Sequence, residues 1–324
     1  MRADIADFEV EEIPNWTPDG SGEHDVLWVE KRRANTRWVA GQLARHAACR
    51  ERDVSYAGLK DRHAVTRQWF SIYRPGRSID WSAFEHPDIQ ILDASAHGRK
   101  IRVGALQGNR FRIRLTDVTV DGTQLERGLQ SVRSYGVPNY FGPQRFGRHG
   151  SNLKLATRLA DGERLRKSEQ GFALSAARSL VFNAVLAARV NHDTWWRPLP
   201  GDALMLNNSH SFFVAGASDD TQTLERRAKL GDLHPTGPLI GAGESPVQDA
   251  ARSLEEATMA GYASMLACVR QGRVDAQRRA LRVLPSEFSA ALDERVLTLA
   301  FSLPAGSFAT ALINELVAVT EAPA

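Results

Sequence analysis

Residues 110–115 read Arg-Phe-Arg-Ile-Arg-Leu, the clearest alternation of charged and apolar side chains in this chain of 324 residues. Successive side chains of a β-strand point to opposite faces, so Phe111, Ile113 and Leu115 share one face and the arginines share the other. The pattern predicts a strand that packs on its apolar side. The arginine side either meets phosphate groups or is a solvated face without a partner.

Segments on both sides of this strand also show strand or helix periodicity. Strands are predicted at residues 25–29, 68–74 and 296–303, and helices at 36–45, 174–190, 246–270, 286–294 and 308–319. The order runs from strand-rich to helix-rich and back to one strand and one helix. It predicts a helical insertion in a mixed α/β domain.

Charge is distributed unevenly along the chain. Residues 1–30 carry nine acids and one base, whereas residues 31–77 have a net charge of +9 and residues 97–154 a net charge of +8. The whole chain has a net charge of only +3. Such a polarised chain can present one positive face to a polyanion such as RNA or DNA. Alternatively, the segments mix in three dimensions and their charges cancel.

Composition and missing signatures exclude several classes. Cys49 and Cys268 are too few for a disulfide framework or a thiolate zinc site. No uninterrupted apolar run approaches the ~18 residues that span a bilayer, and the start is acidic rather than signal-like, so we expect a cytoplasmic protein without a membrane partner. Phosphate-binding, dinucleotide-binding, zinc-protease and serine-nucleophile motifs are all missing. We therefore expect chemistry without a cofactor or a metal.

One carboxylate stands between two cations in residues 56–69, where Asp61 lies between Lys60 and Arg62. The two cations favour an ionised carboxylate at neutral pH, and an ionised carboxylate in a basic cleft can act as a nucleophile or a base. The alternative is a helix cap or a member of a surface salt-bridge cluster.

A second segment, residues 137–147, reads Val-Pro-Asn-Tyr-Phe-Gly-Pro-Gln-Arg-Phe-Gly. Its glycines and prolines predict a shaped loop. Aromatic rings next to Arg145 and Arg148 could stack on bases and bind phosphates. Tight packing at a domain junction would explain the same residues.

Together these segments resemble the TruD family of tRNA pseudouridine-13 synthases. The resemblance rests on Gly58-Leu-Lys-Asp61, Ala64-Val-Thr-x-Gln68, Asn139-Tyr-Phe-Gly-x-Gln-Arg-Phe-Gly147, Gly108-Asn-x-Phe111 and Leu303-Pro-Ala-Gly-Ser-Phe-Ala-Thr310. It extends from near residue 2 to about residue 320. It implies an α+β fold with two parts: a pseudouridine-synthase-like catalytic domain over residues 1–135 and 283–324, built on a mixed or antiparallel sheet with flanking helices, and a helix-rich α/β insertion domain over 136–282.

The resemblance also implies roles for particular residues. Asp61 is the expected nucleophile, with Lys60 supporting it, and the target uridine is expected to contact Phe8, Asn109, Phe111 and Phe308. Binding of tRNA phosphates is predicted for Arg62, Arg110, Arg112, Arg145 and Arg148. The implied partner is tRNA, without an obligatory protein partner, and the protein is expected to be a monomer.

The implied reaction isomerises uridine by breaking its N1–C1′ bond and rejoining the base through C5, which requires no redox change and no metal. The uridine must first be extruded from the RNA stack. Asp61 would attack either C1′ or C6, and the sequence does not choose between them.

Two features depart from the family pattern. Arg62 replaces an expected lysine, and relatives have a longer lead-in before Phe8 than this chain, so its start at Met1 is expected to be truncated or reassigned. A protein that binds RNA as a chaperone on the same fold, without chemistry, is the main alternative. A metal-dependent nuclease is opposed by the lack of clustered carboxylates.

Overall fold

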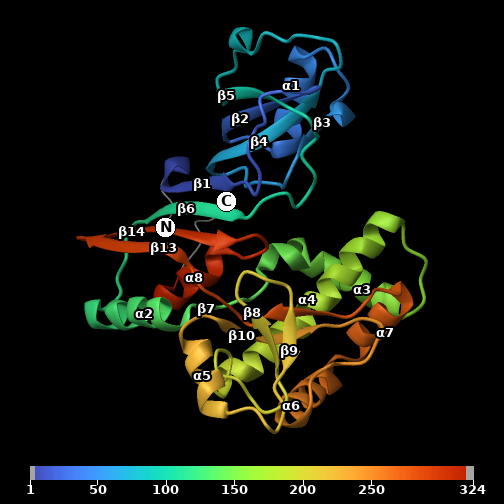
Figure 1. The fold of residues 1–324 in the computed structure, drawn as a ribbon, viewed down its shortest axis with the longest axis vertical. Coiled ribbons are helices and arrows are strands. Elements are labelled where there is room, and N and C mark those ends of the chain that lie inside the picture. The colour runs from blue at the N-terminus through green and yellow to red at the C-terminus, as the bar shows by residue number, and fades with distance from the viewer. Residues whose placement is uncertain (1–3, 319–324) are drawn as a thin grey trace. The chain divides into compact units, whose positions relative to one another are not determined.

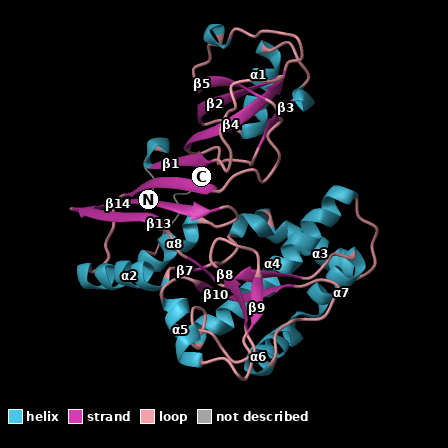
Figure 2. Ribbon diagram, in the orientation of Figure 1, coloured by secondary structure: helices cyan, strands magenta, loops and turns pink. Residues whose placement is uncertain are grey.

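The computed structural model describes residues 4–318, which belong to two compact units. The first unit consists of Met1–Gln124, Pro285–Gly306 and Val317–Ala324, and the second of Leu125–Leu284 and Ser307–Leu316. Strands dominate the first unit and helices dominate the second (Figures 1 and 2). The expected domain limits at 135/136 and 282/283 lie eleven and two residues from the unit bounds at 124/125 and 284/285, and residues 307–316, expected in the catalytic domain, belong to the second unit. The roles of the two domains stay a prediction.

Eight strands of the first unit form one mixed sheet. Its strands are β1 (Phe8–Ile13), β2 (His24–Arg32), β3 (Val54–Tyr56), β4 (Val65–Tyr73), β5 (Ile89–His97), β6 (Gly108–Leu115), β13 (Ser286–Asp293) and β14 (Val296–Pro304). Their order is β13-β14-β6-β1-β4-β2-β5, and β3 lies beside β4. The β1–β4 pair is parallel, and the other pairs are antiparallel. The predicted α+β class with a mixed sheet is therefore confirmed.

The sheet register decides which side chains lie together. Val10 of β1 is opposite Phe111 of β6 and beside Thr66 of β4, and Thr66 is opposite Lys31 of β2. Because side chains alternate between faces, one face collects residues from strands far apart in sequence. We call it the site face; its members include Phe8, Glu12, Lys31, Thr66, Gln68, Asn109, Phe111 and Phe301.

Helix α1 (Thr36–His46) packs on the part of this face formed by β2 and β4. Val39 and Leu43, one turn apart, are wholly buried in the cluster that contains Leu27 and Phe70. The helix predicted at 36–45 is confirmed, and so is the strand at 110–115, in which Phe111, Ile113 and Leu115 are buried while the arginines are exposed.

One predicted helix is wrong, and another is divided into two. Residues 286–294 form edge strand β13, which pairs with β14 through a register shift between Ser286 and Ser289. Its short, mostly exposed sequence gives helix and strand periods equal support, and backbone pairing with β14 decides the outcome. The helix predicted at 246–270 is two helices, α6 (Asp249–Met259) and α7 (Ala263–Gly272), because the backbone leaves helical geometry at Tyr262 (φ −120°, ψ 35°).

The second unit surrounds one long helix, α4 (Lys167–Asn191). Its other elements are α2 (Gly122–Tyr135), β7 (Val137–Pro138), α3 (Ser151–Ala160), β8 (Ala203–Leu206), β9 (Phe212–Val214), α5 (Thr221–Lys229), β10 (Leu233–Leu239), β11 (Gln277–Ala280), β12 (Arg282–Val283), α6, α7 and α8 (Ala309–Leu316). Strands β11-β10-β8-β9 form one sheet, and β12 pairs with β7. The helix predicted at 308–319 corresponds to α8, which is shorter because it ends at Leu316. Val319 lies outside the described residues.

By length and composition alone, α4 is apolar enough to cross a membrane, and it is the one such helix in the described part of the chain. This differs from the prediction that no apolar run approaches the length that spans a bilayer. Half of its most apolar 18-residue window is buried, and Ala173, Ala177 and Val181 pack against α3 and α7 residues. The core helices of soluble proteins pass the same test.

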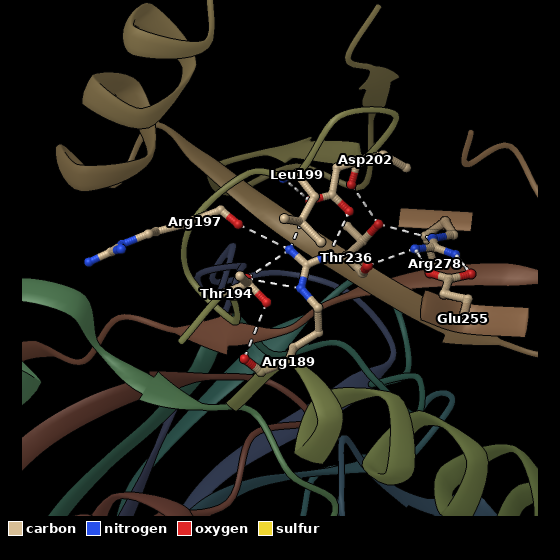
Figure 3. Close-up of polar contacts among 9 residues, drawn as sticks. Arg189, Thr194, Arg197, Leu199, Asp202, Thr236, Glu255 and Arg278 are labelled. Carbon is tan, nitrogen blue, oxygen red and sulfur yellow. Dashed lines mark hydrogen bonds and ion pairs between the residues drawn. The ribbon is translucent and has the colours of Figure 1, made fainter. Parts of the chain in front are cut away.

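Two buried ion pairs tie β10 and its neighbours together (Figure 3). Arg189 on α4 binds both carboxylate oxygens of Asp202, at 2.9 and 2.8 Å. Arg278 on β11 binds both oxygens of Glu255 on α6, at 3.0 and 2.6 Å. Arg278 also donates to the Thr236 hydroxyl on β10. Bidentate geometry satisfies these buried charges and fixes the packing of helix on sheet.

Candidate active site

Residues 57–64 connect β3 to β4, and Asp61 lies in this loop, partly buried. Its Oδ1 accepts a hydrogen bond from the main-chain N–H of His63 at 2.9 Å. The bond is local and precedes a strand rather than a helix, so Asp61 is not a helix cap. Its main-chain carbonyl is held separately, by Lys31 of β2.

Lys31 is a buried cation that the sequence did not single out. Its side chain is wholly buried, and its Nζ donates to the carbonyl oxygens of Ala34, at 2.7 Å, and Asp61, at 2.9 Å. Burial lowers the pKa of Lys31 to about 8; the negative charge of Asp61 opposes this shift and the positive charge of Lys60 adds to it. The Lys31 ammonium thus lies in the electrostatic neighbourhood of Asp61.

Lys60 joins the Asp61 loop to two strands. Its Nζ lies 2.7 Å from Oδ1 of Asn109 on β6 and 3.1 Å from Oε2 of Glu12 on β1. The Glu12 side chain is fully buried, and burial raises its pKa while Lys60 opposes that rise. Within residues 4–318, Glu12 Oε1 has no hydrogen-bond partner. The structure therefore brings Lys60 and Asn109 together and adds Glu12, which the sequence left unassigned.

A chain of buried polar groups fixes the loop backbone. The main-chain N–H of Lys60 donates to the Thr36 hydroxyl at 3.0 Å, and that hydroxyl donates to Gln68 Oε1 at 2.9 Å. Gln68 Nε2 in turn donates to the carbonyl of Gly58 at 3.0 Å. With Lys31, these bonds hold the backbone on both sides of Lys60. Such support preorganises a reactive side chain.

Aromatic rings continue the site face beyond Asn109. Phe111 stacks on Phe301 of β14, with ring centroids 5.3 Å apart, and lies 6.3 Å from Phe8. Phe111 is only 7% exposed, so Phe8, Phe301 and their neighbours cover most of the ring in this structure. The structure brings two of the predicted uridine-contacting rings, Phe8 and Phe111, together with Phe301, which had been assigned only to a strand.

Arg110 and Arg112 lie on the opposite face of the sheet from the site face. Arg110 pairs with Glu11 of β1 at 3.1 Å and with Glu287 at 3.2 Å, and Arg112 lies 3.8 Å from Glu9. The acidic N-terminal strand thus neutralises the arginine face of β6, as expected if the charged segments mix. Arg62, next to Asp61, is exposed and has no ion-pair partner within residues 4–318.

The remaining predicted site residues belong to the second unit. Arg145 donates to the Ser175 hydroxyl at 3.0 Å, and its guanidinium lies 5.0 Å from the centroid of the Phe141 ring. Phe308 packs edge-on against Phe141. Arg148 is exposed.

Packing accounts for much of the 137–147 loop. Asn139 is buried, donates to the carbonyl of Ala280 at 2.9 Å and accepts from Arg279 through both of its oxygens. Phe141 is buried against Phe182 of α4.

Among residues 4–318, no three His, Cys, Asp or Glu side chains lie together as metal ligands would.

Comparison with known proteins connects this arrangement to one family. The profile of the tRNA pseudouridine synthase D (TruD) family matches residues 1–163 and 162–316. The chain is 44% identical to tRNA pseudouridine synthase D of Aeromonas salmonicida, covering 99% of this chain and 91% of that protein. It is 42% identical to the protein of that name from Methylococcus capsulatus, covering 98% and 90%.

The fold matches as well. A crystal structure from Methanosarcina mazei, assigned to TruD, superposes with a TM-score of 0.75, although only 21% of residues are identical. The superposition covers 97% of this chain and 92% of that chain. The likeness is therefore one of fold across both compact units.

Proposed function

This chain belongs to the tRNA pseudouridine synthase D family of isomerases, and from that premise we propose that Asp61 is the nucleophile that converts uridine 13 of tRNA to pseudouridine. The observation that carries the proposal is the loop of Asp61, held by buried groups from α1, β2 and β4 next to Asn109. A solvated surface carboxylate has no need of such support.

The reaction is an isomerisation in which all atoms are conserved. A carboxylate oxygen of Asp61 bonds either to C1′, so that N1 leaves with its electron pair, or to C6 of the uracil, after which the N1–C1′ bond breaks and the base keeps the electron pair. The base then turns, C5 bonds to C1′ and the bond to Asp61 breaks. Finally the C5 proton is lost and N1 gains a proton, which gives pseudouridine.

Each neighbour of Asp61 has a distinct task in this proposal. Lys31 positions the Asp61 backbone and supplies positive charge nearby. Lys60 holds the side-chain oxygen of Asn109, which leaves the Asn109 amide N–H groups for the base. The Phe111 ring offers a face in place of the stacking that an extruded uridine loses.

Phe308, which belongs to the second unit, is the last predicted uridine contact. Only the family motif supports its assignment. Cations bind tRNA phosphates, which gives affinity and register rather than base specificity. Of the five predicted cations, Arg62 has the strongest support, because it is exposed beside Asp61, whereas Arg110 and Arg112 are paired with acids.

The test is pseudouridine mapping on an unmodified tRNA transcript, with wild type and Asp61→Asn. We expect wild type to modify position 13 and Asp61→Asn to bind the transcript and form no product. Activity at wild-type level in Asp61→Asn would contradict the assignment of the nucleophile. Binding without any product in wild type would support the chaperone alternative, and modification only at another position would contradict the assignment of uridine 13.

A further inference from the structure

The exposed turn next to the Asp61 loop has an unusual composition. Residues 102–105 form a β-turn in which the Ala105 N–H donates to the Arg102 carbonyl at 3.0 Å. Gly104 has φ +86°, a conformation that favours glycine. The residue before it, Val103, is 86% exposed, the highest value of any large apolar side chain in the described part of the chain. The turn therefore presents an apolar tip to solvent.

This turn is hydrogen-bonded to the loop that carries Asp61. The Gly104 N–H donates to the carbonyl of Ala57 at 2.8 Å, and the Gln107 N–H donates to the carbonyl of Ile13 at the end of β1. Ile101 is buried and binds the Ser71 hydroxyl through its N–H. On the Asp61 loop, Leu59 lies two residues after Ala57 and is 65% exposed. Two exposed apolar side chains, Leu59 and Val103, thus lie on loops that are hydrogen-bonded to each other.

Positive charge surrounds these two side chains. The exposed cations are Arg62 on the Asp61 loop, Arg102 on the turn, and Arg99 and Lys100 just before the turn. None of the four forms an ion pair with any residue that the structure describes, in contrast to the arginines of β6. The nearby carboxylate of Asp19 is occupied by His97 and by the N–H of Gly98. The two loops joined by the Gly104–Ala57 hydrogen bond therefore carry four exposed cations without an ion-pair partner among the described residues.

We propose that these six residues form an RNA contact edge, which binds the strand that carries the target uridine. The contact edge consists of Leu59, Arg62, Arg99, Lys100, Arg102 and Val103. Its cations bind backbone phosphates, and Leu59 and Val103 pack against the bases that flank the extruded uridine. The inference rests on the proposed function, because it requires that a uridine leave its stack at Asp61.

Physical chemistry favours RNA over another partner here. Free cations match the phosphate chain, whereas a protein partner would be expected to meet a larger continuous apolar area. Extruding a base costs a few kcal/mol of stacking, and proteins offset such costs by inserting apolar side chains between bases. A valine on a preformed turn gives that contact without loss of loop entropy on binding.

The charges are tested by replacing Arg99, Lys100 and Arg102 together with Gln. A matched control replaces Arg158, Arg227 and Arg252 with Gln, since these exposed arginines of the second unit each pair with an acid. Affinity for one tRNA transcript is measured over a range of KCl concentrations. Each lost phosphate contact lowers the salt slope by about 0.7–0.9. We expect the turn variant to lose a slope of about 2 and at least about tenfold in affinity, and the control to retain both.

The apolar contact is tested by photocrosslinking to the same transcript. Wild type with p-benzoylphenylalanine in place of Val103 is expected to crosslink to nucleotides next to the target uridine. The same replacement of Leu92, which is 41% exposed on β5, is the control and is expected to give none. Equal crosslinking at both positions, or none at 103, would overturn the apolar contact.

These outcomes are separable from the fate of the proposed function. A wild type that forms no pseudouridine contradicts the proposed function itself. If the wild type forms pseudouridine but the turn variant and the control variant bind tRNA equally well, the contact edge alone is contradicted. Its charges would then serve another partner. Circular dichroism on every variant confirms that exposed substitutions leave the fold intact.

Discussion

Both units contain buried charges, but they satisfy them differently. In the second unit, Arg189 and Arg278 each bind both oxygens of a carboxylate, and Thr236 links one pair to the central strand (Figure 3). In the first unit, Lys31 is buried without a carboxylate within ion-pair distance among the described residues; it binds two carbonyls. Inside the described range neither buried oxygen of Glu12 has a hydrogen bond of good geometry, although Lys60 Nζ lies 3.1 Å from Oε2.

Under the proposed function, the difference separates charges that stabilise the fold from charges that assist the chemistry at Asp61. A fully satisfied buried network specifies packing, and losing one member leaves the other charge uncompensated. A half-satisfied network costs stability, so its retention calls for another reason. Burial raises the pKa of Glu12 and lowers that of Lys31. Such opposed shifts around one carboxylate are typical of an active site.

The largest expected effects come from removing one carboxylate charge in each unit. Asp202→Asn leaves buried Arg189 without its counter-charge and should lower the free energy of unfolding by about 3–5 kcal/mol. Asp61→Asn should leave the unfolding transition nearly unchanged and reduce pseudouridine formation by at least about 10⁴-fold. Chemical denaturation and single-turnover assays measure the two quantities. If Asp61→Asn is destabilised more than Asp202→Asn, the proposed difference between the two units is contradicted.

The second prediction concerns the Glu12–Lys60 pair. Lys60→Met leaves the Glu12 carboxylate buried without a counter-charge, so it should destabilise the protein by about 3–5 kcal/mol, less if Glu12 takes up a proton. Adding Glu12→Leu removes the buried charge and should restore most of that stability. Activity should stay low in the double variant, because Asn109 has lost its partner. Full recovery of activity together with stability would assign the pair a purely structural role.

Local periodicity explains why several elements could be predicted. The alternation of β6 and the apolar spacing of α1 are properties of a few adjacent residues, and each repeats the period of its element. The edge strand β13 lacked such a signal, because most of its side chains are exposed. Its pairing with β14 is decided by backbone bonds that the side-chain pattern does not encode.

The candidate site was predicted where it lay in one motif and missed where it depended on sheet register. Asp61 lies between Lys60 and Arg62 in sequence, a pattern that left a nucleophile or base and a surface salt-bridge cluster both open, and the family resemblance favoured the nucleophile. Lys31 looked like the start of a basic surface stretch, and Glu12 like part of an acidic one. Only the alignment of β1, β2, β4 and β6 places both side chains on the site face, because a register shift of one residue would expose them.

The third prediction tests whether Phe111 serves the substrate or the sheet. Phe111→Leu keeps an apolar side chain against Phe8 and Phe301 but removes the aromatic face. Stacking of a base on an aromatic ring contributes about 1–3 kcal/mol, so the reaction rate should fall by roughly ten- to a hundredfold. Affinity for tRNA should change little, since phosphate contacts dominate it. A variant with a normal rate and reduced stability would make the ring a packing residue only.

The smallest expected effect is a pH dependence that comes from Lys31. Because the pKa of Lys31 is lowered to about 8, its positive charge is present below that pH and is lost as the pH rises through it. If this charge assists Asp61, the single-turnover rate should decline above pH 8, by up to about tenfold. Lys31→Arg keeps the charge at every accessible pH and should remove the decline even if its overall rate is lower. The Arg189–Asp202 pair offers the control: Asp202→Asn, assayed at a temperature where it remains folded, should show the wild-type pH profile. A decline that persists unchanged in Lys31→Arg would arise from another group, and Lys31 would then hold the Asp61 loop through its hydrogen bonds alone.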